Sequence, residues 1–191
     1  MQTTHEISPE VIEQFVIAAH GNEELVREMH AQQPYLVNVT WEKFNETPLQ
    51  AASHMGNRSI ARYLISQGAH PDICTHAMLG DAEQVARCLE ADPAQAQATG
   101  AHGIPVMYHA ALSGKPEVAE MLVAHGGGEG IDQALHAAVS FGHLDMVRWL
   151  LENGAQNVNV LNFNNETPLK AALTNGHTEI ADLLRERGGT E

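Results

Sequence analysis

Apolar residues recur four, five, eight and nine positions after a set of glycines that runs along the chain. After Gly142, for example, these positions hold Met146, Val147, Leu150 and Leu151. Largely similar series follow Gly21, Gly56, Gly80, Gly114 and Gly176. This spacing places an apolar stripe on one face of a helix with a period of 3.6 residues. Because a short alanine-rich segment precedes each glycine, the predicted unit is a helix, a glycine turn and a second helix.

One octapeptide is written almost identically twice, as NETPLQAA at 45–52 and NETPLKAA at 165–172. Threonine followed by proline is a helix start signal, because threonine caps free N–H groups and proline presets φ at the first helical position. Gln50 stands where a capping box requires it, relative to Thr47. Asn45 and Asn165 precede the signal, and asparagine tolerates left-handed backbone geometry. The octapeptide therefore predicts the same turn and helix start at two places.

Three stretches carry a family resemblance: NETPLQAASHMGN…IARYLISQGAHPD, ALHAAVSFGHLDMVRWLLENGAQNVN and NETPLKAALTNGHTEIADLLRERGG. They resemble ankyrin repeats, with the TPL, AA, GH, VxxLL and GA elements in their usual order, and the resemblance extends over essentially the whole chain. It implies an all-α fold, an ankyrin-repeat solenoid of stacked antiparallel helix pairs with β-hairpin or loop fingers between the pairs. We expect one domain over 1–191, with approximate units at 9–40, 45–73, 74–98, 102–127, 130–158 and 165–189.

The spacing of the turn glycines departs from the family period of about 33 residues. Two intervals are short, and their connecting segments AHPDICTH (69–76) and HGGGEGIDQ (125–133) have no room for a full finger. Three longer segments remain, NVTWEKFNE (38–46), QAQATGAHGIP (95–105) and NVNVLNFNNE (157–166). We therefore expect an uneven row in which long fingers alternate with short turns.

Composition and charge narrow the choice of partner. The chain is 43% hydrophobic, with 24 acidic against 10 basic residues and a net charge of −14. Nucleic-acid binding needs clustered lysine and arginine, which are scattered here. No apolar run approaches the ~20 residues that span a bilayer, and the first residues lack the pattern of a secretory signal. We expect a cytoplasmic, monomeric protein with no nucleic-acid or membrane partner.

The resemblance implies a protein–protein interaction module, not an enzyme, which binds an unidentified protein partner through its concave face and fingers. Residues just before the turn glycines and in the fingers are expected to be exposed there. The predicted contact residues are Trp41, Lys43, Glu46, His54, Met55, Met78, Leu112, Ser140, Phe141 and Phe163. An alternative for Phe44 and Phe163 stays open, namely that they only pin their fingers to the stack.

Signs of chemistry are weak despite twelve histidines. No HExxH pair, phosphate loop or nucleophile motif occurs, so we expect no catalytic residue, no cofactor and no metal. His136, His143 and His177 occupy positions that are structural in the family. The second hypothesis is a metal- or small-molecule-responsive protein or hydrolase that uses Cys74, His76, His102 and His109 in the third and fourth repeats. A secreted bacterial effector that binds a host protein is a narrower variant, which the residues neither support nor oppose.

Overall fold

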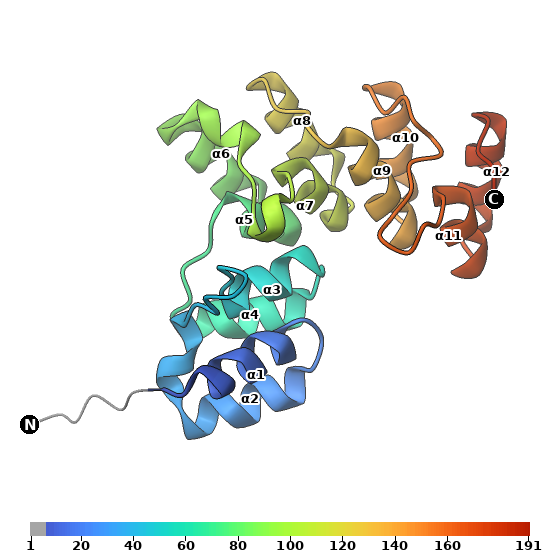
Figure 1. The fold of residues 1–191 in the computed structure, drawn as a ribbon. Helices are drawn as coiled ribbons and strands as arrows, with labels where there is room; N and C mark the ends of the chain where they lie inside the picture. Colours follow the sequence, from blue (N-terminus) through green and yellow to red (C-terminus); the bar gives the residue numbers. More distant parts are fainter. Residues whose placement is uncertain (1–6) are drawn as a thin grey trace, which may run out of the picture.

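The computed structural model describes residues 7–191, which form twelve α-helices in six antiparallel pairs (Figure 1). The first helix of each pair is α1 (Pro9–Ala19), α3 (Pro48–His54), α5 (Ile73–Leu79), α7 (Val106–Ser113), α9 (Ile131–Ser140) or α11 (Pro168–Thr174). The second is α2 (Glu23–Gln32), α4 (Arg58–Ser66), α6 (Ala82–Ala91), α8 (Pro116–Ala124), α10 (Leu144–Glu152) or α12 (Thr178–Glu186). Three short 3-10 helices, η1 (Pro34–Asn38), η2 (Pro93–Gln97) and η3 (Ala101–Gly103), lie in the connections. The predicted all-α solenoid is confirmed.

The octapeptide forms the predicted helix start in both places. The Thr47 hydroxyl accepts the backbone N–H of Gln50, and the Gln50 side chain accepts the N–H of Thr47, which completes a capping box. Thr167 caps α11 in the same way, through the N–H of Lys170. Asn45 and Asn165 are left-handed, with φ of 50° and 57°. These local features follow from the sequence because their partners lie within one helical turn.

The core runs through the stack between neighbouring repeats. The apolar stripe is buried as predicted; Val147 and Leu150 of α10, for example, have no exposed surface. Paired alanines such as Ala137 and Ala138 of α9 are also buried. Small side chains allow α5, α7, α9 and α11 to pack side by side, as Figure 1 shows. Burial of this repeated stripe is the main stabilising contribution, since no single repeat can cover its own apolar face.

The fingers are uneven, as expected. The first closes with a bridge between Trp41 and Glu46, and the second with a bridge between Thr99 and Pro105. The third is held by a hydrogen bond from the Asn162 N–H to the Glu166 carbonyl (3.1 Å). The connections 67–72 and 125–130 are short turns. The long fingers are thus tight loops with at most a single bridge, in place of extended hairpins.

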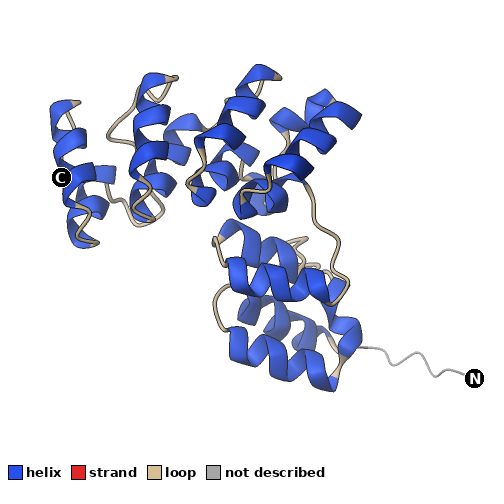
Figure 2. Ribbon diagram, turned by 180° about the vertical axis from the view of Figure 1, so that it is seen from behind, coloured by secondary structure: helices blue, strands red, loops and turns tan. Residues whose placement is uncertain are grey.

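The array bends sharply between the second and third repeats. The pairs α1–α2 and α3–α4 form one block, and the pairs from α5 to α12 form a second block that runs across its end (Figures 1 and 2). The start of α4 contacts the fourth repeat directly. The guanidinium of Arg58 donates hydrogen bonds to the backbone carbonyls of Leu112 and Ser113 at the end of α7. A Cβ placed on Gly56 would lie 2.8 Å from Cζ of Phe141. Repeat 2 therefore touches repeats 4 and 5 as well as its neighbours.

The structure corrects three sequence-based predictions. Met78, Leu112 and Glu46 were expected on the exposed concave face, but all three are buried. Leu112 lies beneath the α3–α4 turn, and Met78 belongs to α5, which packs against both α3 and α7. Glu46 faces a group of histidines in place of solvent. The predictions assumed a regular stack, in which the end of each first helix would stay open.

Candidate functional site

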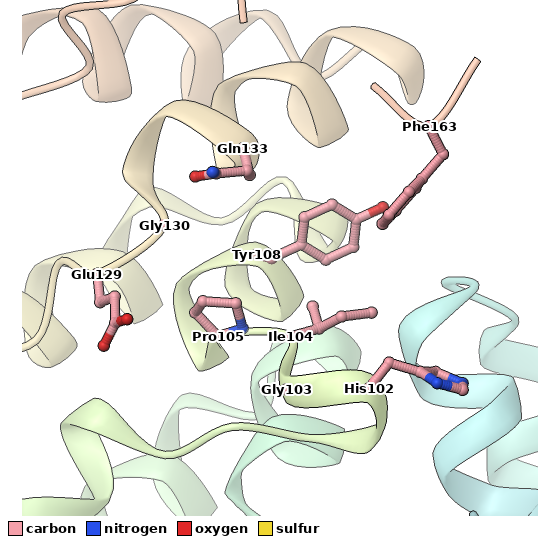
Figure 3. Close-up of a pocket in the computed structure, with 9 residues that line it drawn as sticks. All are labelled: His102, Gly103, Ile104, Pro105, Tyr108, Glu129, Gly130, Gln133 and Phe163. Carbon is pink, nitrogen blue, oxygen red and sulfur yellow. The ribbon is translucent and has the colours of Figure 1, made fainter. Parts of the chain in front are cut away.

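A groove on the concave side of the second block is the clearest candidate binding site. Three adjoining cavities there share two residues, Tyr108 of α7 and Phe163 of the third finger. The cavity in Figure 3 has a volume of about 360 Å³ and is lined on one side by Ile104 and Pro105 of the second finger. In that view the Tyr108 ring extends toward Phe163, and Gln133 of α9 lies above it. We call these three cavities together the Tyr108 groove.

Exposed apolar side chains surround the Tyr108 groove. Phe163 is 96% exposed and Leu161 is 55% exposed, both in the third finger. Phe141 and Met55, at the ends of α9 and α3, are 46% and 45% exposed and line the same hollow. Large apolar side chains that remain in water gain free energy when a partner covers them. The open alternative that Phe163 pins its finger is not favoured at this degree of exposure.

Polar groups fix the far wall of the groove. The His136 Nε2–H donates to the backbone carbonyl of Glu166 (3.0 Å), which ties α9 to the third finger. The Ser140 hydroxyl donates to the carbonyl of His136 (2.9 Å). The structural role predicted for His136 is thereby confirmed. His143 and His177 also bond backbone carbonyls of the preceding repeat, those of Leu112 and Ser140.

The predicted contact residues divide between two places. His54, Met55, Ser140, Phe141 and Phe163 line the Tyr108 groove together. Trp41 and Lys43 line a separate hollow at the first finger, beside Ile7, Pro9 and Ile12. Trp41 is half-buried, packs edge-on against Phe44 with ring centroids 4.7 Å apart, and has the Lys43 ammonium 5.7 Å from its ring. Trp41 is thus a finger anchor at least in part, away from the groove.

The cysteine and histidine chemistry of the second hypothesis finds little support. Cys74 is buried, and this burial, followed by the nearby Asp72 carboxylate, raises the pKa of its thiol far above the ordinary value. A thiol held protonated is a poor nucleophile, because the thiolate is the reactive form. Burial likewise lowers the pKa of His109, whose Nδ1 bonds the Pro105 carbonyl. This arrangement weighs against a cysteine hydrolase in the third repeat.

A group of titratable side chains that the sequence reading missed lies at the inside of the bend. It comprises His20, Glu46, His54 and His102. Burial by itself would raise the pKa of Glu46, but the hydrogen bond from His54, followed by electrostatic interaction with the three neighbouring histidines, lowers it below the usual range. One signal was available, because His20 and His54 stand at the ends of consecutive first helices, which stacking brings side by side.

The fold defines the class of protein, a solenoid built from stacked antiparallel helix pairs with loop fingers. Comparison with known protein families then identifies the family within this class. Residues 73–161 and 106–191 match "Ankyrin repeats (3 copies)", and residues 14–65 match "Ankyrin repeats (many copies)". The chain belongs to the ankyrin repeat family. Ankyrin repeats are generally protein–protein interaction modules, and the family is typically non-enzymatic.

A curated relative matches only part of the chain. The "Probable E3 ubiquitin-protein ligase XBOS33" of Oryza sativa subsp. japonica is 46% identical over 55 residues, which are 29% of this chain and 10% of that protein. The chain thus spans about a tenth of the relative's length, and the similarity concerns a repeat segment. Across residues 7–191, every helix is too short or too polar to cross a membrane.

Proposed function

We propose that this protein binds a protein partner through its concave face, with the Tyr108 groove as the central contact. The observation that carries the proposal is the nearly complete exposure of Phe163 at the edge of a hollow that also contains Tyr108, Phe141 and Met55. Aromatic and methionine side chains in such a setting are typical of binding hot spots. The fold supports the general function, and the groove supplies the specific surface.

The chemistry of the groove indicates what the partner presents. Its centre is apolar and about 360 Å³ in one cavity, so it suits one or two apolar side chains of a loop or extended segment. Glu129 and Gln133 lie at one end, and the chain as a whole carries a net charge of −14. Basic residues beside the apolar anchor would therefore accelerate association. The proposal takes the protein as monomeric and cytoplasmic.

The test compares capture by the unsubstituted chain with capture by Phe163→Ala/Phe141→Ala. Val123→Ala is the matched control, because Val123 is an exposed apolar residue on the second helix of its repeat. Proteins retained by the unsubstituted chain and by the control, but lost with the groove variant, are the candidates. Binding of each purified candidate is then measured, and we expect the groove variant to weaken it at least ten-fold.

A photo-crosslinking residue at position 163 tests the location directly. The candidate should be crosslinked from position 163 and not from position 123. Because Phe163 makes little contact with the rest of the chain, Phe163→Ala should leave the melting temperature nearly unchanged. Equal affinities for the groove variant and the control would refute the groove as the binding surface.

A further inference from the structure

Three histidines surround one buried carboxylate at the inside of the bend. Glu46 Oε1 lies 2.9 Å from His54 Nε2 and 3.3 Å from His102 Nε2, and Glu46 Oε2 lies 3.6 Å from His20 Nε2. One donor atom from each of the four side chains can be chosen so that all lie within 4.8 Å of one another. Ligand atoms of a tetrahedral zinc site, at roughly 2.0–2.1 Å from the ion, are about 3.3–3.4 Å apart. The cluster therefore has nearly the dimensions of a four-ligand metal site.

The hydrogen bonds of this cluster leave one pair of atoms, His20 Nε2 and Glu46 Oε2, without a hydrogen between them when His20 is neutral. His20 Nδ1 bonds the backbone carbonyl of Val16 (2.9 Å), and a carbonyl only accepts, so Nδ1 carries the proton. In the neutral ring, Nε2 then presents a lone pair toward Glu46 Oε2. That oxygen is buried and has no hydrogen-bond partner. When the ring is neutral, two acceptors face each other, and the contact requires a positive charge, supplied by a proton on His20 Nε2 or by a bound cation.

The His20 contact also matches a known feature of metal sites. A ligating histidine usually donates its other ring N–H to a carbonyl or carboxylate, which fixes the tautomer and aims the lone pair at the ion. The Val16 carbonyl provides this support for His20. Glu46 itself is 1% exposed, so its orientation is fixed by the protein around it.

His102 completes the cluster from the other side of the bend. It belongs to the second finger and has a left-handed backbone with φ of 59°. In Figure 3 its imidazole points away from Tyr108, toward the neighbouring helices of the first block. The side chain is 37% exposed, which leaves an entry path for an ion. The other three ligands come from repeats 1 and 2, so an ion here would join the two blocks.

We propose that His20, Glu46, His54 and His102 form a binding site for a first-row transition-metal dication, with Zn²⁺ as the reference ion. Three imidazoles and one carboxylate suit such ions, whereas Mg²⁺ and Ca²⁺ prefer oxygen ligands. Four protein ligands leave no open position on a tetrahedral ion, so the site is structural and fastens the bend. His54 and His102 also line the Tyr108 groove, but the argument for a metal site does not depend on the partner-binding function.

The test is a Zn²⁺ titration of chelator-treated protein, with a chromophoric competitor present so that weak sites on the other histidines stay empty. We expect one Zn²⁺ per chain and a rise in melting temperature. Because His54 Nε2 donates to Glu46 in the absence of metal, ligation through Nε2 requires the ring to change to the tautomer protonated at Nδ1. Co²⁺ in place of Zn²⁺ should give the visible bands of a tetrahedral site.

His102→Ala and Glu46→Gln are the variants, and each should weaken Zn²⁺ binding at least ten-fold. Two controls are matched to them. His125→Ala removes an exposed histidine that also bonds a carbonyl through Nδ1, and Glu166→Gln alters the glutamate of the second octapeptide. Circular dichroism checks that each variant is folded. Absence of Zn²⁺ uptake, or equal affinity in the variants and controls, would show that the cluster is only a histidine–carboxylate ion pair and overturn the proposal.

Discussion

The two octapeptides form the same turn and helix start, but their glutamates lie in different surroundings. Both asparagines are left-handed and both threonines cap a helix. Yet the Glu46 side chain is 1% exposed and sits among three histidines, whereas that of Glu166 is 31% exposed and lies 3.6 Å from Lys170. His20 and His54 come from two stacked first helices, and the bend adds His102 by folding the second finger back over repeat 2. Local sequence determines the turn, and the path of the array determines what its glutamate does.

The glycine turns that follow α3 and α11, the helices that the two octapeptides begin, should give the largest losses of stability. Gly56 and Gly176 both have positive φ, at 71° and 74°. A Cβ on Gly176 meets nothing within 4 Å, but one on Gly56 runs into Phe141. We expect Gly176→Ala to cost about 1–2 kcal/mol from backbone strain alone, and Gly56→Ala about 1 kcal/mol more, because the Phe141 ring must move. Urea unfolding of both variants measures the difference.

The added cost at Gly56 is attributable to Phe141 only if the two positions are coupled. In a double-mutant cycle, Phe141→Ala should remove most of the excess cost of Gly56→Ala. Additive effects would mean that the bend does not press these residues together.

Removal of the two glutamates should give the next largest loss. With metal chelated, we expect Glu46→Ala to lower the free energy of unfolding by about 1–3 kcal/mol, because it removes the buried carboxylate that the three part-exposed imidazoles contact. Glu166→Ala breaks an exposed pair with Lys170 and should cost less than about 0.5 kcal/mol. Thermal and urea unfolding in chelator provide both values. Equal costs would place Glu46 in an environment no different from that of Glu166.

Substitution of Asn45 and substitution of Asn165 should change the free energy of unfolding by the same amount. Asn45→Ala and Asn165→Ala each force alanine into a left-handed conformation, at a cost of about 1 kcal/mol. Asn→Gly at either position should be neutral, since glycine adopts this conformation freely. Chemical denaturation of the four variants tests whether the turn itself is the same in both surroundings. A clear difference would show that the bend also alters the backbone of the first finger.

A pH effect should distinguish His143, which lies beside the bend, from an ordinary exposed histidine. Burial, followed by the charges on Arg58 and His177, lowers its pKa, although the bond to the Leu112 carbonyl acts in the opposite direction. The unfolded chain therefore gains a proton at higher pH than the folded one does. Its stabilising contribution is present above the unfolded pKa, about 6.5, and is lost as the pH falls through the folded pKa. His143→Gln should show a shallower loss of stability than the unsubstituted chain between pH 7.5 and 5; parallel curves would contradict this.

The sequence predicts those parts of the fold that depend on near neighbours. The capping box of Thr47 and Gln50 and the apolar stripe that contains Val147 and Leu150 were all predictable, because each follows from spacing along one helix. The uneven fingers followed from segment length. The groove was predictable in part, since Phe141, Phe163 and Met55 were chosen for their position next to turns.

The bend was not predictable, and neither was the cluster that depends on it. Leu112 looks like a surface residue in a regular stack and becomes core because repeat 2 folds against repeat 4. His102 approaches Glu46 through the same change of direction. No period in the sequence encodes an angle between blocks, because that angle results from packing between repeats that are not adjacent. The short connecting segment 69–76 indicated where the array departs from a regular stack, but not the direction of the bend.

Arg58 has a consequence for how the array unfolds. A repeat solenoid is usually treated as a row of units coupled only to their immediate neighbours, so that it can unravel from either end. The hydrogen bonds from Arg58 to the carbonyls of Leu112 and Ser113 join the second repeat directly to the fourth. Loss of the first block therefore uncovers surface in the middle of the second block and not only at its edge. The two blocks should therefore unfold together, and the contacts at the bend should contribute most to this cooperativity.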